Sequence, residues 1–138
     1  MIIAATLATL LLTQAAGQTP QPKPDFSGIW VPIAGVNPVV ELTVTQTADT
    51  LTARAGTDAA HMLSVRLDGV ESTQNDGAVV SKAQWDGPRL VVTHAFKATR
   101  NLQRQVWSVD ASGILTIETS REQNGNVTRT NKSTYKRR

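Results

Sequence analysis

The chain has 138 residues and a formal net charge of +3, with 18% charged residues, 4% aromatic residues and no cysteine. A chain of this length forms one domain, and the lack of cysteine excludes a disulfide framework and a thiolate metal site. The many threonine, valine and alanine residues favour strands over helices.

The first seventeen residues are predicted to be a signal peptide. Residues 2–12 are almost entirely apolar, and cleavage after Gly17 would place Ala15 and Gly17 at the two positions that a signal peptidase reads. The apolar run is too short to span a bilayer comfortably, so no stable membrane anchor is expected after cleavage. The predicted location of the mature protein is the periplasm or the extracellular space.

Residues 18–25 contain three prolines and are predicted to form an extended tether, which leaves residues 26–138 as the folded domain. In this domain, short runs of alternating apolar and polar residues are separated by turn signals such as Asp86-Gly87 and Asn124-Gly125. No run has a helical period. We therefore expect an all-β, antiparallel meander that closes into a small barrel of eight or nine strands.

The stretch from Phe26 to Trp30 is predicted to organise the barrel. Gly28 and Trp30 lie two positions apart, so on a strand they face the same side of the sheet. The indole of Trp30 is expected to enter the core, and Gly28 is expected to let another segment approach closely.

Short motifs run from the start to the end of the predicted domain: Phe26-Ser27-Gly28-x-Trp30, Asp68-Gly69, Trp85-Asp86-Gly87-x-x-Leu90, Trp107 with Asp110-x-x-Gly113, and Tyr135-Lys136-Arg137. Together they resemble small exported bacterial proteins of uncharacterised function that are described as lipocalin-like. The Gly-x-Trp element is also similar to the opening motif of true lipocalins, in which the tryptophan packs under a basic side chain of the last strand. The resemblance implies a calycin-like barrel with Arg137 over Trp30, with Lys136 or Arg129 as substitutes, and it implies no reaction.

The sequence gives little support for catalysis or for a cofactor. The two histidines, His61 and His94, are far apart and have no short-spaced partner, which argues against a metal site. No Gly-x-Ser-x-Gly turn presents a nucleophile, and most aspartates occupy turn positions where they bond their own backbone. We therefore expect no enzyme activity, no metal and no cofactor.

The end of the chain is basic, with six lysine or arginine residues from Arg121 onward against Glu122 alone. We interpret this run as a solvated last strand whose charges prevent pairing with neighbouring molecules at a sheet edge. Nucleic-acid binding is not expected, because Tyr135 is the only aromatic residue nearby that could stack on a base.

His94 shares a predicted inward face with Leu90, Val92 and Phe96. Two interpretations are open: a core histidine satisfied by a neighbour, which we favour, or a histidine that orients a ligand in an apolar pocket. The candidate ligand-binding residues are His94, Phe96, Trp85 and Trp107.

Two functions are compatible with these features. Small residues on predicted inward faces (Ala53, Ala55, Ser81 and Ala83) and a scarcity of aromatic residues favour a barrel that binds a small apolar or amphipathic molecule. The alternative is a structural or interaction module of the cell envelope with a self-filled core. The protein partner of such a module is not specified by the sequence.

Overall fold

The structure is a computed structural model that describes residues 22–36, 39–57 and 62–138. The predicted signal peptide and His61 lie outside these residues. The described residues form ten antiparallel strands: β1 Gly28–Ala34, β2 Leu42–Gln46, β3 Thr50–Ala55, β4 Met62–Arg66, β5 Ser72–Gln74, β6 Val79–Asp86, β7 Arg89–Phe96, β8 Asn101–Val109, β9 Ile114–Gln123 and β10 Asn126–Arg137. Among these residues no helix has the length and apolarity needed to cross a membrane. The all-β prediction is confirmed, with ten strands instead of eight or nine.

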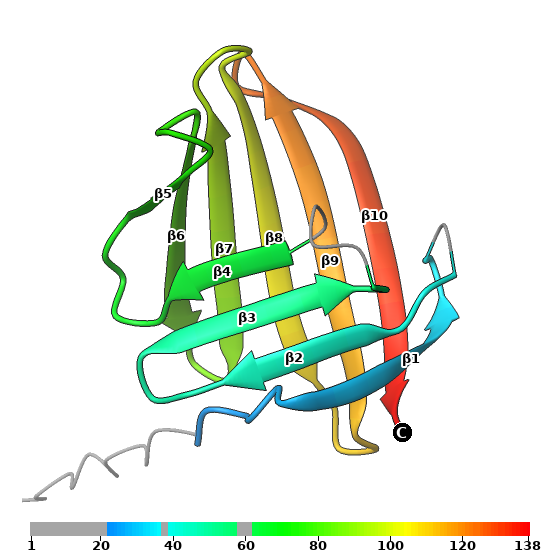
Figure 1. Cartoon of the computed structure of the whole chain (residues 1–138). Coiled ribbons are helices and arrows are strands. Elements are labelled where there is room, and N and C mark those ends of the chain that lie inside the picture. The colour runs from blue at the N-terminus through cyan, green and yellow to red at the C-terminus, as the bar shows by residue number, and fades with distance from the viewer. Residues whose placement is uncertain (1–21, 37–38, 58–61) are drawn as a thin grey trace, which may run out of the picture.

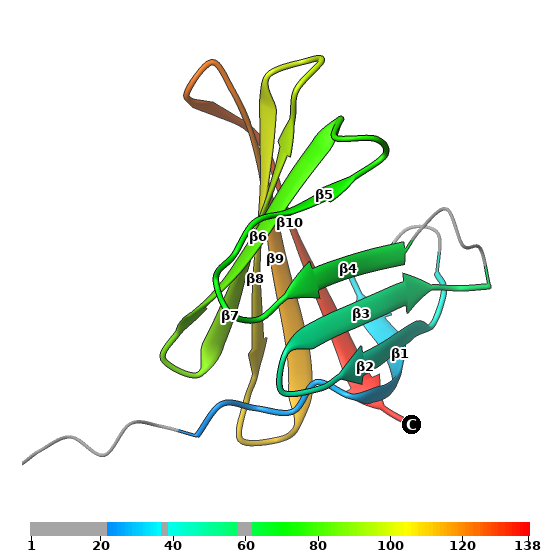
Figure 2. The same ribbon diagram turned by 60° about the vertical axis from the view of Figure 1, so that its left-hand side comes forward.

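The ten strands form one sheet in the order β4-β3-β2-β1-β10-β9-β8-β7-β6-β5. Figure 1 shows the short strands β1–β4 crossing in front of the long strands β6–β10, and Figure 2 shows the two layers facing each other. β1 joins the layers, because it pairs with β2 on one side and with β10 on the other. The barrel is nearly closed: at the remaining seam, the Gln74 amide on β5 donates to the Ser64 carbonyl on β4 at 2.9 Å.

The basic last strand is exposed along most of its length but is not a terminal strand of the sheet, so the prediction that the chain ends in an edge strand is wrong. β10 pairs with β9 along most of its length and with β1 at its end. The two terminal strands of the sheet are β4 and β5 instead. Only Thr134–Arg137 of β10 pair with β1, so Asn126–Ser133 pair with β9 alone among the described residues.

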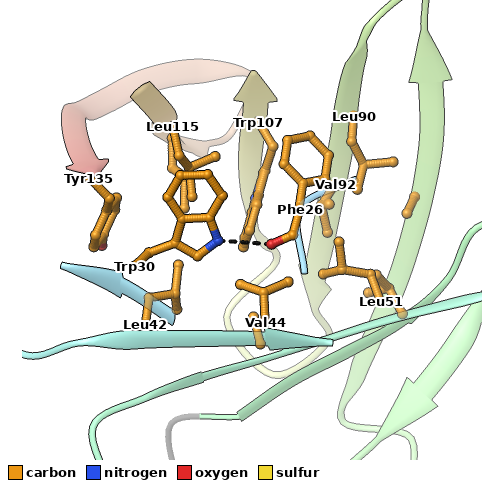
Figure 3. Packing of buried hydrophobic residues seen from close by; sticks show 14 of the residues in the cluster. Phe26, Trp30, Leu42, Val44, Leu51, Leu90, Val92, Trp107, Leu115 and Tyr135 are labelled. Carbon is orange, nitrogen blue, oxygen red and sulfur yellow. Dashed lines mark hydrogen bonds between the residues drawn. The ribbon is translucent and has the colours of Figure 1, made fainter. Parts of the chain in front are cut away.

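The hydrophobic core fills the end of the barrel where β1–β3 cross the long strands (Figure 3). Trp30 is fully buried, and its indole N–H donates to the Phe26 carbonyl oxygen at 2.8 Å. The Phe26 ring lies edge-on to Trp107, with 5.7 Å between ring centroids, and stacks with Trp85 at 6.0 Å. The other buried apolar residues come from seven further strands and the segment after β4: Leu42, Val44, Leu51, Ala53, Val65, Leu67, Ala83, Leu90, Val92, Leu115, Ile117 and Tyr135.

Arg137 closes this end of the barrel over Trp30. Its guanidinium carbon lies 4.4 Å from the centroid of the indole, and its two terminal nitrogens donate to the carbonyl oxygens of Ser27 and of Asp25, the latter at 3.1 Å. A Cβ atom at Gly28 would lie 3.1 Å from the nearer of these nitrogens. Gly28 therefore leaves room for the arginine, and the contact that the resemblance implied is present with Arg137.

Residues 22–25, the described part of the predicted tether, lie against the barrel. The Pro24 carbonyl oxygen accepts a hydrogen bond from the Gln46 amide at 3.2 Å. The Lys23 ammonium lies 5.4 Å from the centroid of the Trp85 ring. The segment just before Phe26 thus covers one side of the aromatic cluster.

Candidate ligand-binding pocket

An open pocket of about 700 Å³ lies beside the core, between the β1–β2 loop, the adjoining ends of β2 and β3, and the inner faces of β8–β10. This volume is within the range of small-molecule sites. One part of its lining is apolar: Val36, Val40, Leu42, Ala55 and Tyr135. Another part is polar: Gln103, Thr119, Arg121, Arg129, Asn131 and Ser133.

The floor of the pocket is continuous with the hydrophobic core. Leu42 and Tyr135 are buried members of the core cluster, and Ala55 packs against that cluster. Burial raises the pKa of the Tyr135 hydroxyl above its ordinary value. At neutral pH the floor therefore offers apolar surface and one uncharged phenol.

One wall of the pocket is a loop held against β10 at Gly35. The Gly35 carbonyl oxygen accepts hydrogen bonds from the Asn131 amide at 3.1 Å and from the Ser133 hydroxyl at 2.8 Å. Gly35 has a φ of 71°, and a Cβ atom there would lie 1.8 Å from the Lys132 carbonyl oxygen. The loop can lie this close to β10 only because the residue is glycine.

Two arginines face each other at the mouth of the pocket. Arg121 on β9 and Arg129 on β10 are register partners, and both side chains are exposed. Like charges directly opposite each other on a sheet repel. Among the described residues, the ion pairs are formed by other side chains, and neither arginine has a carboxylate partner. The mouth of the pocket thus carries two positive charges that the described part of the chain does not neutralise.

The two arginines end a row of polar side chains that crosses the inner face of the long strands. Successive register partners along this row are Ser72, Ser81, His94, Gln103, Arg121 and Arg129, on strands β5–β10. We call these six residues the polar row. Four residues along the same strands toward the core, the register partners on this face are apolar: Trp85, Leu90, Trp107 and Ile117. The inner face therefore changes from apolar to polar along the length of the long strands.

His94 lies in the polar row and is only 8% exposed. Its Nδ1 atom is 2.7 Å from the Oγ atom of Ser81, which is fully buried. Burial lowers the pKa of His94 below its ordinary value, so the imidazole is uncharged at neutral pH. The interpretation of a core histidine satisfied by a neighbour is supported by this hydrogen bond.

The stability of the protein should decrease as the pH falls below about 6.5, the ordinary pKa of histidine. The unfolded chain takes up a proton at His94 in this range, whereas the folded protein, in which the pKa is lowered, does not. Urea denaturation at pH ~7.5 and ~5.5 measures the effect. The His94→Gln variant keeps a hydrogen-bonding side chain beside Ser81 and should show a smaller loss between the two pH values. An equal loss in parent and variant would contradict the assignment to His94.

The four predicted ligand-binding residues do not line the pocket. Trp107 is a core residue, and its indole N–H donates to the Gln105 amide oxygen at 3.0 Å. Trp85 is half-buried and stacks on Phe26, and Phe96 is half-buried near the end of β7. Gln103 is the last residue of the polar row that lines the pocket. His94, its register partner on β7, is the next residue of the row and lies outside the lining.

The residues that give the pocket its polarity, Gln103, Arg121 and Arg129, were not predicted from the sequence. A signal for Arg129 exists, because it has the same parity as the buried Tyr135 on a strand. Arg121 likewise shares parity with the buried Leu115 and Ile117 on β9, and Gln103 shares parity with the buried Trp107 on β8. Among the described residues, no group of three or more histidine, aspartate or glutamate side chains is placed to hold a metal ion.

Comparisons with known proteins identify the fold and no sequence family. No family model matches the chain, and no curated protein sequence matches it significantly. The chain is similar in structure to secretory abundant heat soluble protein 4 from Ramazzottius varieornatus, with a TM-score of 0.58, 18% identity, and coverage of 86% of this chain and 97% of that one. It is also similar to a mutant of the fluorescent protein UnaG, with a TM-score of 0.54, 17% identity, and coverage of 82% and 96%.

A luciferase domain from the dinoflagellate Lingulodinium polyedrum is a third similar structure, with a TM-score of 0.54 and 11% identity. The match covers 88% of this chain and 45% of that chain. At these identities the likeness concerns the fold. The chain therefore has a calycin-like β-barrel fold.

Proposed function

We propose that the protein is an exported binding protein without catalytic activity, which holds a small amphipathic molecule with an anionic group. The observation that carries this proposal is the pocket itself, with an apolar floor at Leu42, Ala55 and Tyr135 and, at its mouth, two arginines that have no carboxylate partner among the described residues. The apolar part of the ligand would lie on the floor, out of water. Its anionic group would lie between Arg121 and Arg129.

The charge arrangement supports an anion more than a neutral molecule. An anionic group between Arg121 and Arg129 would relieve the repulsion of two like charges on neighbouring strands. It would also accept charge-assisted hydrogen bonds, which guanidinium groups provide in a fork geometry suited to carboxylate and phosphate. Both arginines are exposed, so an anion can reach them directly from solvent.

The pocket also favours binding over the alternative of an envelope module with a self-filled core. The core fills the end of the barrel around Trp30, but about 700 Å³ remains open beside it. A purely structural barrel gains no stability from such a space. The export of the protein to the periplasm or the medium is proposed from the apolar first seventeen residues and their cleavage pattern.

Calorimetric titration with dodecanoate tests the proposed function. The parent protein should bind dodecanoate, and the double variant Arg121→Ala/Arg129→Ala should bind it at least about tenfold more weakly, since a hydrogen bond to a charged group contributes about 1.5–3 kcal/mol. Dodecyltrimethylammonium has the same apolar tail and the opposite charge, and it should bind poorly to the parent.

The matched control is Arg104→Ala, which removes an exposed arginine from the outer face of β8 and should leave dodecanoate affinity unchanged. The proposal fails if dodecanoate shows no saturable binding. It also fails if the cationic detergent binds as tightly as dodecanoate, because binding would then not depend on the arginines.

A further inference from the structure

We infer that the pocket also recognises a neutral hydrogen-bonding group of its ligand, which is bound by Gln103 and, one strand further along the polar row, by the Nε2 atom of His94. This inference rests on the proposed function and narrows the ligand class. The ligand would be an amphipathic acid that carries a hydroxyl or a carbonyl group in addition to its anionic group.

The polar row places Gln103 one strand away from Arg121 and His94 two strands away. Gln103 is the register partner of Arg121, and His94 is the register partner of Gln103. Because neighbouring strands lie about 4.8 Å apart, Gln103 is about 5 Å and His94 about 10 Å from Arg121 along the row. A molecule whose anionic group lies at the arginines can therefore extend over Gln103 toward His94.

Hydrogen-bonding capacity along this row is largely unused. Among the described residues, neither the Gln103 amide nor the Nε2 atom of His94 has a hydrogen-bond partner, and the only bond of His94 is to Ser81 through Nδ1. The Ser72 hydroxyl is enclosed and also lacks a partner there. Polar groups that face an interior normally have partners, since leaving them unpaired is unfavourable.

The contrast with other polar residues in the same pocket is informative. Asn131 and Ser133 are both bound to the Gly35 carbonyl and hold the loop that forms the wall. Their presence is thus explained by the fold. Gln103 lines the same pocket and holds no other described residue in place, so a ligand group is a better account of its position.

The chemistry of the row specifies a neutral group rather than a second charge. The Gln103 amide both donates and accepts hydrogen bonds and has no charge. Burial lowers the pKa of His94, so its imidazole is uncharged at neutral pH and cannot neutralise a second anion. A hydroxyl group, which donates and accepts, matches both side chains, and a carbonyl group can accept from the amide.

Titration with three acids of the same chain length tests this inference: dodecanoate, β-hydroxydodecanoate and ω-hydroxydodecanoate. At least one of the two hydroxylated acids should bind the parent about fivefold more tightly than dodecanoate, as one additional neutral hydrogen bond of about 1 kcal/mol predicts. The Gln103→Leu variant should bind all three acids with similar affinity. Gln84→Leu, at an exposed position on β6, is the control and should keep the preference.

A second measurement uses the parent protein and so does not depend on how a variant folds. Nitrogen NMR of the His94 imidazole should show a larger change at Nε2 with the preferred hydroxylated acid than with dodecanoate. If dodecanoate binds but neither hydroxylated acid is preferred, or if Gln103→Leu keeps the preference, this inference is overturned and the proposed function stands. If none of the three acids binds, both are overturned.

Discussion

Replacing Trp30 with alanine should lower the free energy of unfolding by about 3–5 kcal/mol, as truncations of large buried aromatic residues do. The indole is fully buried, and its N–H group donates to the Phe26 carbonyl at the centre of the core. A domain of this size has about 5–15 kcal/mol of stability in total. The variant should therefore be marginally folded, and its urea denaturation midpoint should fall sharply.

Arg137→Ala is the matched variant, because it removes the group above the indole and leaves the indole in place. It should lower the free energy of unfolding by about 1–2 kcal/mol, because it removes the cation–π contact and two hydrogen bonds to exposed backbone carbonyls. It should also remain folded. If Trp30→Ala melted like the parent protein, the ring would not be part of the core. If Arg137→Ala lowered the free energy of unfolding more than Trp30→Ala, the arginine and not the indole would be the main source of stability at this end of the barrel.

Gly35→Ala should destabilise the protein by at least about 2 kcal/mol, although it adds a single methyl group. The new Cβ atom would overlap the Lys132 carbonyl oxygen, and the φ of 71° at this position is unfavourable for alanine. To relieve the overlap, the loop must move away from β10 and lose its hydrogen bonds to Asn131 and Ser133. Urea denaturation measures the loss of stability, and dodecanoate titration should show weaker binding because the loop is a pocket wall.

Gly113→Ala separates the two causes of this effect. Gly113 has a similar φ of 78°, but nothing lies within 4 Å of the position that its Cβ atom would take. The variant should therefore lose only about 1 kcal/mol of unfolding free energy, from the unfavourable φ of the new alanine. Its affinity for dodecanoate should be unchanged. Equal losses in the two variants would mean that the loop does not lie against β10 as described.

Alternating residues and turn pairs were sufficient to predict most of the barrel. Runs in which apolar and polar residues alternate, such as those around Leu42, Leu51, Val65 and Leu90, form strands, and the turn pair Asp86-Gly87 lies between β6 and β7 as expected. β5 was missed because Ser72–Gln74 is entirely polar and has no alternation. The first half of β8 was missed for a similar reason, since Asn101–Gln105 contains a single apolar residue.

The pocket was harder to predict than the fold, because it depends on register. A register shift between Val127 and Arg129 places Arg129 opposite Arg121. No residue pattern in the sequence predicts this shift. The basic run at the end of the chain was interpreted as a solvated edge strand. The charge of a residue alone does not indicate whether its side chain lies on the inner or the outer face of the sheet. Parity with Tyr135 was the one usable indication for Arg129.

The coexistence of a packed core and an open pocket follows from unequal strand lengths. β2–β5 have three to six residues each, whereas β6–β10 have eight to twelve. The short strands therefore cover only part of the inner face of the long ones, as Figure 1 shows. Where they cover it, the inner face is apolar and packed around Trp30. Toward the other end of the long strands, it carries the polar row, which is buried at Ser81 and His94 and exposed at Arg121 and Arg129.

The pairing of β1 with β10 also has a consequence for the order of folding. Every other pair of neighbouring strands in the sheet is adjacent in the sequence and can form through short loops. β1 and β10 come from opposite ends of the described domain, so their association carries the largest loop-closure cost and is expected late. Contacts made after the transition state affect mainly the unfolding rate. Trp30 and Arg137 meet across this pair, so we expect substitutions there to change the unfolding rate more than the folding rate.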